Sequence, residues 1–134
     1  MKLKIFTGIL ALLLAGCDPG GLIPEEEFFL SKTWKISEVL VNGEPEVDTD
    51  FSLYRIEMRE DGTFTRRSIQ GNSEEGVWSL TNAGTQLILF EGDFREERYL
   101  IIKLQLRLLE LQLTQKNNKT GDKEFRFVMV PVKP

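Results

Sequence analysis

The stretch YRIEMREDGTFTRRSI, residues 54–69, contains two strand patterns on either side of a turn signal. Its first half alternates Tyr54, Ile56 and Met58 with charged residues, which is the period-two pattern of a half-buried β-strand. Asp61-Gly62 follows, and an Asp-Gly pair between alternating segments is the strongest short-range signal for a β-hairpin. We therefore predict that residues 54–59 and 63–69 pair as antiparallel strands.

Short apolar segments separated by turn residues continue on both sides of this hairpin. Before it, a predicted strand over residues 30–41 ends at Asn42-Gly43, a dipeptide that tolerates positive φ and marks a tight turn. After it, the predicted strands cover residues 76–80, 85–90, 99–106, 109–114 and 124–130. A meander of about eight short strands leaves exposed edges unless the sheet closes. We therefore predict an all-β fold, an eight-stranded antiparallel up-and-down barrel.

Residues 100–113, LIIKLQLRLLELQL, fit two periodicities at once. Leucine and isoleucine share one face at period two, but a helical stripe is also present, formed by Ile101, Leu104, Leu108 and Leu111. The segment is rich in good helix formers, so a helix is the alternative. We favour two strands that meet near Arg107, because the leucines shift there from even to odd positions, as a tight turn or bulge requires.

The N-terminus carries the pattern of a bacterial secretion signal. Lys2 and Lys4 precede an apolar segment of about ten residues, well short of the roughly 20 that a membrane-spanning helix needs. The sequence LAGC at residues 14–17 then resembles the lipobox of bacterial lipoproteins. The resemblance implies that residues 1–16 are removed as a signal peptide and that Cys17 is acylated with fatty acids such as palmitate. Such an anchor would hold the protein on the outer membrane, facing the periplasm or the cell surface.

A spacer follows the cysteine. Residues 17–27 hold prolines, glycines and the acidic run Glu25-Glu26-Glu27, which together disfavour helix and strand. We interpret the run as a solvated, self-repelling part of a flexible tether, and residues 28–134 as the folded domain. An acidic cluster near the lipidated cysteine also resembles the surface-export signal of some Gram-negative lipoproteins, so the membrane face stays open.

Charge and residue usage disfavour several function classes. The chain has a formal net charge of -4, and without residues 1–16 it keeps 15 basic against 21 acidic residues, a net charge of -6. An acidic domain without a basic stripe disfavours nucleic acid as a partner. The chain has no histidine, and acylation consumes its only cysteine, Cys17. The chain thus lacks the residues that usually form zinc sites, haem sites and nucleophilic catalytic centres. We therefore predict no metal and no cofactor.

Carboxylate pairs are the remaining candidates for catalysis, because two carboxylates are what glycoside hydrolysis needs. The pairs are Asp48 with Asp50, Glu74 with Glu75, and Glu96 with Glu97. All three lie in predicted polar loops, where solvated charge is the expected state. We therefore predict that the protein is not an enzyme.

Several short motifs together resemble the lipocalin-like domain of small bacterial, Gram-negative lipoproteins. They are Trp34 on the first strand, Asp61-Gly62-Thr63-Phe64, Gly76-Val77-Trp78, Leu87-Ile88-Leu89 and Leu109-Glu110-Leu111. The resemblance covers residues 28–130. Lys32 stands where the main lipocalin group carries the glycine of a Gly-x-Trp motif on this strand.

The resemblance implies a cup that binds a small hydrophobic molecule or a glycan fragment. From the strand alternation, the predicted ligand contacts inside the barrel are Tyr54, Met58, Phe64, Arg66, Trp78, Phe125 and Phe127. Alternatively, these side chains fill the interior as a solid core. Arg66 shares the phase of Phe64, and it either places a polar group inside or turns outward at a rim bulge.

Two functions from different classes follow from these patterns. The first is a lipid-anchored envelope protein that binds a small hydrophobic ligand. The second is a non-catalytic structural or interaction protein, or an inhibitor, that docks an envelope protein partner at the membrane. The fold alone does not choose between them.

Overall fold

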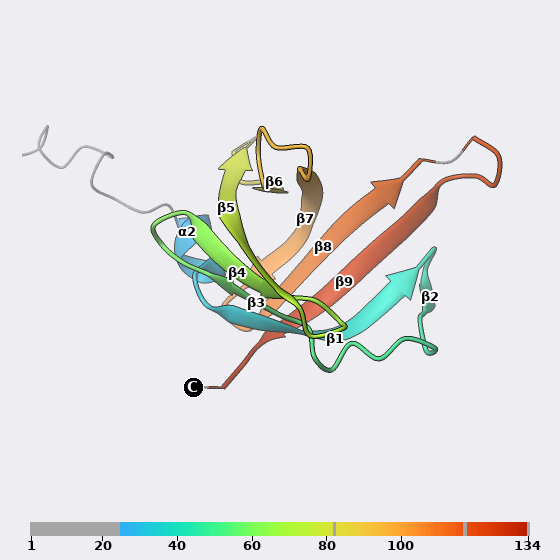
Figure 1. The fold of residues 1–134 in the computed structure, drawn as a ribbon, viewed down its shortest axis with the longest axis horizontal. Coiled ribbons are helices and arrows are strands. Elements are labelled where there is room, and N and C mark those ends of the chain that lie inside the picture. The colour runs from blue at the N-terminus through green and yellow to red at the C-terminus, as the bar shows by residue number, and fades with distance from the viewer. Residues whose placement is uncertain (1–24, 82, 117, 134) are drawn as a thin grey trace, which may run out of the picture.

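The computed structural model describes residues 25–81, 83–116 and 118–133. Over these ranges it contains one short helix followed by nine strands (Figure 1). In chain order they are α2 (Glu25–Leu30), β1 (Thr33–Val41), β2 (Glu44–Pro45), β3 (Arg55–Met58), β4 (Thr63–Arg67), β5 (Ser73–Thr81), β6 (Gln86–Leu89), β7 (Glu97–Gln105), β8 (Leu108–Gln115) and β9 (Lys123–Pro131). Within these ranges, no helix has the length and apolar character needed to cross a membrane.

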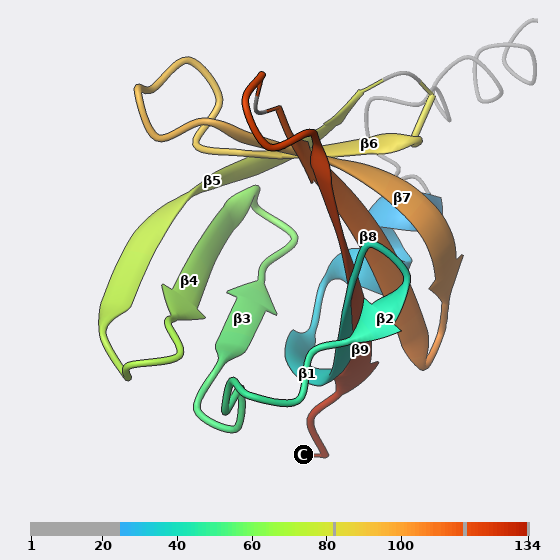
Figure 2. The ribbon, with the colours of Figure 1, turned by 90° about the vertical axis from the view of Figure 1, so that its right-hand side faces the viewer.

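Eight of the described strands form a closed antiparallel barrel. From β3 to β9, each strand pairs with its neighbour in sequence, and β1 pairs with both β3 and β9, which closes the sheet (Figure 2). The short strand β2 pairs with the end of β1 and lies outside the closed wall. This arrangement confirms the predicted eight-stranded up-and-down barrel.

The predicted hairpin around Asp61-Gly62 forms β3 and β4. Met58 lies opposite Phe64 in the register of the two strands. At the turn, Gly62 adopts a φ of 88°, a conformation that residues with a side chain rarely adopt. The Asp61 carboxylate accepts hydrogen bonds from the backbone N–H and the hydroxyl of Thr63, at 3.0 and 2.7 Å. The turn residues therefore help to set the register that brings Phe64 to the inner face.

Residues 100–113 form two strands, as predicted. A two-residue turn at Leu106-Arg107 joins β7 to β8. The register also shifts between Ile101 and Lys103, which marks a bulge in β7. The bulge moves the inward position from odd to even residues, so that Ile101 packs against the core before it and Leu104 after it, whereas Leu100 and Ile102 are exposed. After the turn, two odd-numbered leucines of β8, Leu109 and Leu111, are buried.

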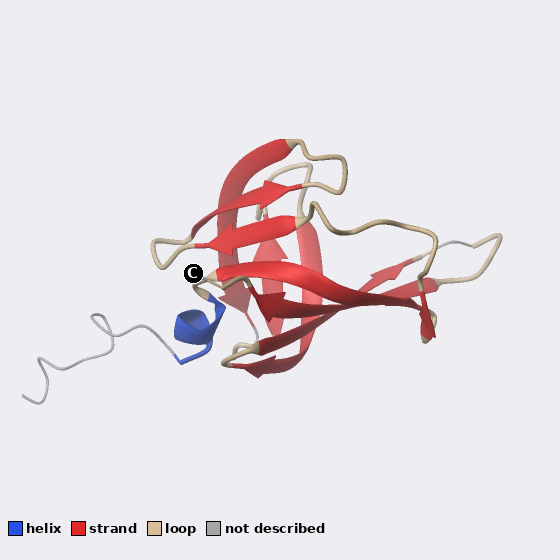
Figure 3. Cartoon of the chain, turned by 90° about the horizontal axis from the view of Figure 1, so that it is seen from below, coloured by secondary structure: helices blue, strands red, loops and turns tan. Residues whose placement is uncertain are grey.

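The helix α2 closes the end of the barrel at which β1 begins (Figure 3). Its last residue, Leu30, is fully buried, and the Leu30 carbonyl accepts a hydrogen bond of 3.0 Å from the indole N–H of Trp34. The acidic run 25–27 forms the first turn of this helix, where negatively charged side chains stabilise the helix through its dipole. From the sequence this run was predicted to belong to the flexible tether, and the structure places it in α2 instead. Residues 1–24, including Cys17, lie outside the described residues.

The apolar faces of the strands form a core next to α2. Its most deeply buried side chains come from strands on all sides of the barrel, and they include Trp34, Phe64, Leu87, Leu109 and Met129. Because alternate residues of each strand face inward, the period-two pattern of the sequence appears directly in this core.

The barrel wall is uneven at the end opposite α2. β1 pairs with β3 only through Thr33 and Trp34, and it then continues along β9 as far as Val41. β8 and β9 pair as far as Gln115 and Lys123. These three strands therefore extend past the rest of the wall, and Figure 1 shows them running out to the right together with β2.

Candidate functional site

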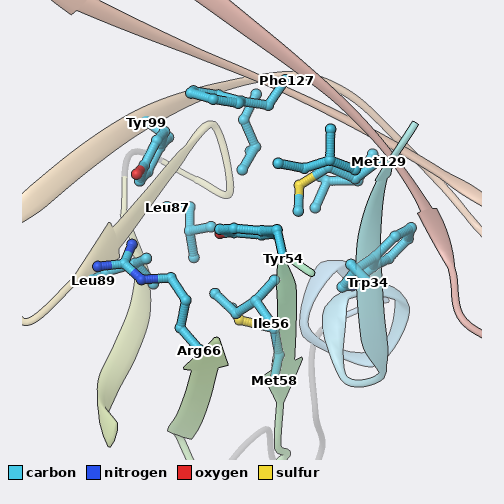
Figure 4. A pocket seen from close by; sticks show the side chains of 13 residues that line it. Trp34, Tyr54, Ile56, Met58, Arg66, Leu87, Leu89, Tyr99, Phe127 and Met129 are labelled. Carbon is cyan, nitrogen blue, oxygen red and sulfur yellow. The ribbon is translucent and has the colours of Figure 1, made fainter. Parts of the chain in front are cut away.

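A cavity of about 100 Å³ lies inside the barrel (Figure 4). The lining residues are Trp34, Ile36, Tyr54, Ile56, Met58, Arg66, Leu87, Leu89, Tyr99, Leu109, Leu111, Phe127 and Met129. Most of these side chains are apolar, and Arg66 is the charged member of the set. The barrel interior is therefore not completely filled by its own side chains.

Two carboxylates hold Arg66 inside the barrel. Its Nη1 and Nη2 donate hydrogen bonds of 2.7 and 2.8 Å to the two carboxylate oxygens of Glu97 on β7. Its Nε and Nη2 donate hydrogen bonds of 3.0 and 2.8 Å to Oε2 of Glu74 on β5. The Arg66 side chain is 12% exposed. Of the two orientations that the sequence left open for Arg66, the structure shows the inward one.

Two tyrosines complete this polar cluster. The Tyr99 hydroxyl donates a hydrogen bond of 2.6 Å to Oε1 of Glu97. Burial, the negative charge of Glu97 and this hydrogen bond raise the pKa of Tyr99 well above its ordinary value. Burial also raises the pKa of Tyr54 to about 12, although the nearby Arg66 guanidinium opposes the shift. Both tyrosines therefore stay neutral up to strongly alkaline pH.

The Arg66–Glu97 pair remains ionised in spite of its burial. Burial lowers the pKa of Arg66, but the hydrogen bonds and charge of Glu97 outweigh this effect, so the pKa of Arg66 is raised. Burial raises the pKa of Glu97, but hydrogen bonds from Arg66 and Tyr99 outweigh it, so the pKa of Glu97 is lowered. The four hydrogen bonds from Arg66 to carboxylates use four of the five N–H groups of a guanidinium. Arg66 therefore has little capacity left for an anionic ligand.

Comparison with known proteins gives the family of the chain. The sequence model described as a lipocalin-like domain matches residues 30–111, more than half of the chain. The chain belongs to this lipocalin-like family. No curated protein matches it.

Two crystal structures share the fold of this lipocalin-like domain. A lipocalin-like protein from Bacteroides uniformis has a TM-score of 0.52 and 14% sequence identity, and the similarity covers 78% of this chain and 99% of that chain. An uncharacterized protein from Bacteroides eggerthii has a TM-score of 0.50 and 15% identity, with 77% of this chain and 99% of that chain covered. At such low sequence identity, the similarity to these two structures shows a common fold and nothing more.

The lipocalin-like barrel has a second hollow at its open end, which we call the outer groove. It has a volume of about 380 Å³ and lies between the extension of β1, β8 and β9 and the loop that follows β2. Its apolar lining residues are Val39, Val41, Phe51, Leu113, Phe125 and Phe127. Its polar lining residues are Glu46, Thr49, Gln115 and Lys123.

The structure brings together four of the seven predicted contact residues. The four that line the interior cavity are Tyr54, Met58, Arg66 and Phe127. Phe125 lines the outer groove instead, because it lies one inward step farther along β9 than Phe127, opposite Val41 at the end of β1.

Phe64 and Trp78 are buried, but they line neither hollow. The Phe64 ring packs edge-on against Phe90, with ring centroids 5.0 Å apart. The indole N–H of Trp78 donates a hydrogen bond of 2.9 Å to the Arg59 carbonyl. Their inward phase is as predicted, but they contact Phe90 and the Arg59 carbonyl and are not part of the cavity lining.

Tyr99 and the two carboxylates of the polar cluster were not predicted as site residues. Glu74 and Glu97 were predicted to lie in solvated loops, whereas the structure places them in β5 and β7 with their carboxylates bound to Arg66. Tyr99 carried a usable signal, since it lies at period two from Ile101 on the same predicted strand. In the part of the chain that the structure describes, no group of three or more histidine, cysteine, aspartate or glutamate side chains is arranged to hold a metal ion.

Proposed function

We propose that this lipocalin-like domain is a non-catalytic binding protein for a small, mainly apolar molecule whose polar end is neutral or cationic. The observation that carries the proposal is a cavity that combines apolar walls with an arginine whose donors already bind carboxylates. Ligand sites are typically of this kind, with a mostly apolar lining and a few placed polar groups that orient the ligand.

The charges around the cavity argue against an anionic ligand. Glu74 and Glu97 together outnumber the single positive charge of Arg66. Nearby Arg95 forms its own ion pair with Asp93, with 3.0 Å between Nη2 and Oδ2. A further negative charge in this partly buried cluster would be repelled, because charges interact more strongly there than in bulk water. The net negative charge of the cluster instead attracts an ammonium group, and a neutral hydroxyl can form a hydrogen bond with the Tyr54 or Tyr99 hydroxyl, both of which line the cavity.

The size of the cavity limits what it can hold alone. Its 100 Å³ is less than the volume of about 150 Å³ of an engineered cavity that binds benzene. It is also below the roughly 300–1,000 Å³ of typical small-molecule sites. The interior therefore fits a very small molecule or one part of a larger one.

Tryptophan fluorescence can test binding in the interior. Trp34 lines the cavity and Trp78 does not. In a Trp78→Phe variant, the remaining indole reports on the cavity, and in Trp34→Phe the remaining indole is the matched control. We expect 1-butanol and butylamine to change the emission of Trp78→Phe saturably, and butyrate to have a much weaker effect. Equal responses in both variants, or the strongest response to butyrate, would contradict the proposal.

We further propose that Cys17 attaches the protein to the membrane as an outer-membrane lipoprotein, on the basis of the LAGC sequence. The described chain begins with α2 at the closed end of the barrel. An anchor that precedes α2 would therefore join the domain at the closed end of the barrel, and the outer groove lies at the opposite end. Replacing Cys17 with Ser is expected to release the protein from the membrane fraction, and continued membrane association would contradict the anchor.

A protein partner is the second candidate function, because large apolar side chains are exposed on β7 and on the loop that precedes it. Phe94 is 97% exposed in the loop after β6, and Leu100 and Ile102 are exposed on β7. Exposed apolar surface of this kind is common at protein interfaces. Pull-down from crosslinked cells tests the idea: a partner that is lost in Phe94→Ser would support it, and recovery of no stable partner would contradict it.

A further inference from the structure

Phe127 lies between the two hollows of the barrel. It lines both the interior cavity and the outer groove. On the groove side its ring is stacked with Phe125, with centroids 6.2 Å apart and an interplanar angle of 12°. On the cavity side it meets the ring of Tyr99 edge-on at 6.1 Å. The two hollows therefore share an aromatic wall.

The floor of the two hollows is one continuous apolar surface. Met129, which lines the cavity, and then Phe127 and Phe125 are successive inward residues of β9. Phe125 pairs with Val41 on β1 and with Leu113 on β8, so the groove continues the inner face of the barrel wall. Two residues along a strand span about 7 Å, so the floor extends one such step beyond Phe127.

A polar rim ends this apolar floor. The next pair of the same phase on β8 and β9 is Gln115 opposite Lys123. Across the groove, the lining includes Glu46 and Thr49, and the Thr49 hydroxyl donates a hydrogen bond of 2.8 Å to Oε2 of Glu46. An apolar chain that leaves the cavity therefore has a limited length of apolar surface to cover before it reaches polar groups.

We propose that the interior cavity and the outer groove form one elongated site for a linear apolar ligand, whose chain passes Phe127. This inference rests on the proposed function, because it requires a ligand in the interior. The groove, at about 380 Å³, supplies the volume that the cavity of about 100 Å³ lacks. Rotation of the Phe127 side chain is the local movement that joins the two volumes.

A series of straight-chain primary alcohols, from 1-butanol to 1-dodecanol, tests this site. The methyl groups of Met58 and Met129 both belong to the cavity lining, so their NMR signals report occupation of the interior. Each additional buried methylene is expected to tighten binding about fourfold until the polar rim is reached. A series in which affinity stops rising at the shortest alcohols would overturn the inference of one elongated site.

A pair of matched variants locates the chain in the groove. Val41→Ser changes the groove floor, and Val77→Ser makes the same change at a residue that is 51% exposed and outside both linings. We expect Val41→Ser to weaken 1-dodecanol binding about tenfold and to leave 1-butanol binding unchanged, and Val77→Ser to change neither. Equal losses for both alcohols in Val41→Ser would overturn the inference.

Two further outcomes separate this inference from the proposed function. If 1-dodecanol binding depends on Val41 but leaves the methyl signals of Met58 and Met129 unchanged, the groove is a separate site and the inference fails, while 1-butanol binding still supports the proposed function. If none of the alcohols shifts these methyl signals, the proposed function fails and the inference fails with it.

Discussion

The guanidinium of Arg66 and the carboxylate of Glu97 meet inside the barrel through two hydrogen bonds of 2.7 and 2.8 Å, although the two residues are 31 positions apart in the chain. The pair connects β4 to β7, two strands that are not neighbours in the sheet. It therefore spans the interior, and it both orients a polar group toward the cavity and contributes to the stability of the fold.

Replacing Arg66 with Met should destabilise the protein by about 3 kcal/mol, because it leaves two partly buried carboxylates without their cation. Arg98→Met is the matched control, since Arg98 pairs with Glu96 at 2.7 Å but its side chain is 52% exposed. That variant should lose less than about 1 kcal/mol. Urea unfolding measures the free energy of unfolding of both variants. Similar decreases in the two variants would show that the interior ion pair stabilises the fold no more than the exposed one.

Acid should remove the contribution of Glu97 to stability. The folded state lowers the pKa of Glu97 below its ordinary value of 4.5, so this contribution is fully present above that pH and is lost as the pH falls through the lowered pKa. The free energy of unfolding of the wild type should therefore exceed that of Glu97→Gln at pH 7, and the difference should shrink toward pH 3. A difference that stays constant over this range would contradict the assignment.

The two tyrosines of the chain, Tyr54 and Tyr99, should both lose their hydroxyl protons only at a pH above the ordinary tyrosine pKa of 10. Burial raises the pKa of Tyr54 to about 12, and burial with the charge of Glu97 raises the pKa of Tyr99 as well. Since the folded-state values exceed those of the unfolded chain, stability is retained below pH 10 and lost as the pH rises above it. Absorbance of tyrosinate should appear only together with alkaline unfolding, and a transition near pH 10 in folded protein would be inconsistent with burial of these rings.

Gly76→Ala should disturb the packing of Phe90. A Cβ at residue 76 would lie 2.5 Å from Cε1 of Phe90 and 3.0 Å from Cε1 of Phe64, so a buried ring would have to move. We expect a loss of about 1–3 kcal/mol. In a double-mutant cycle with Phe90→Leu, chemical denaturation should show coupling between the two sites, because the smaller side chain leaves room for the added methyl group. Additive losses would show that the two residues do not interact.

Trp78→Ala should cost about 3–5 kcal/mol, because the change removes a large buried ring. The Trp78 side chain is only 5% exposed, and its indole N–H donates a hydrogen bond to the Arg59 carbonyl. Thermal unfolding checks this expectation. A variant that unfolds cooperatively at an unchanged melting temperature would contradict the burial of this residue.

The strands and hairpins could be predicted because their signals are local. Alternation around Ile56 and the Asp61-Gly62 turn specify one hairpin within a few residues. The phase shift near Arg107 separated β7 from β8 in the same way. The short helix α2 was not predicted, because six residues are too few to show a repeating helical pattern of apolar side chains. Its glutamates are also common in spacers.

The composition of the site could be predicted only in part, because it depends on how the sheet closes. Phase alone places Phe64, Trp78 and Phe125 inside. Which inward residues reach the cavity depends on long-range contacts, such as the one between Phe64 and Phe90, and on how far along β9 the cavity extends. Glu97 could not be recognised as a site residue within its charged segment, because its partner Arg66 lies next to it only in the folded barrel.

Native mass spectrometry can show whether the barrel interior binds a small apolar molecule. The protein would be purified without detergent as the Cys17→Ser variant, alone and combined with Leu111→Phe, which adds volume to a residue that lines the cavity. Leu100→Phe, at a residue that is 42% exposed, is the matched control. We expect a noncovalent small-molecule adduct that is retained with Leu100→Phe and lost with Leu111→Phe. A protein that is always empty, or an adduct that persists unchanged with Leu111→Phe, would contradict ligand binding in the barrel interior.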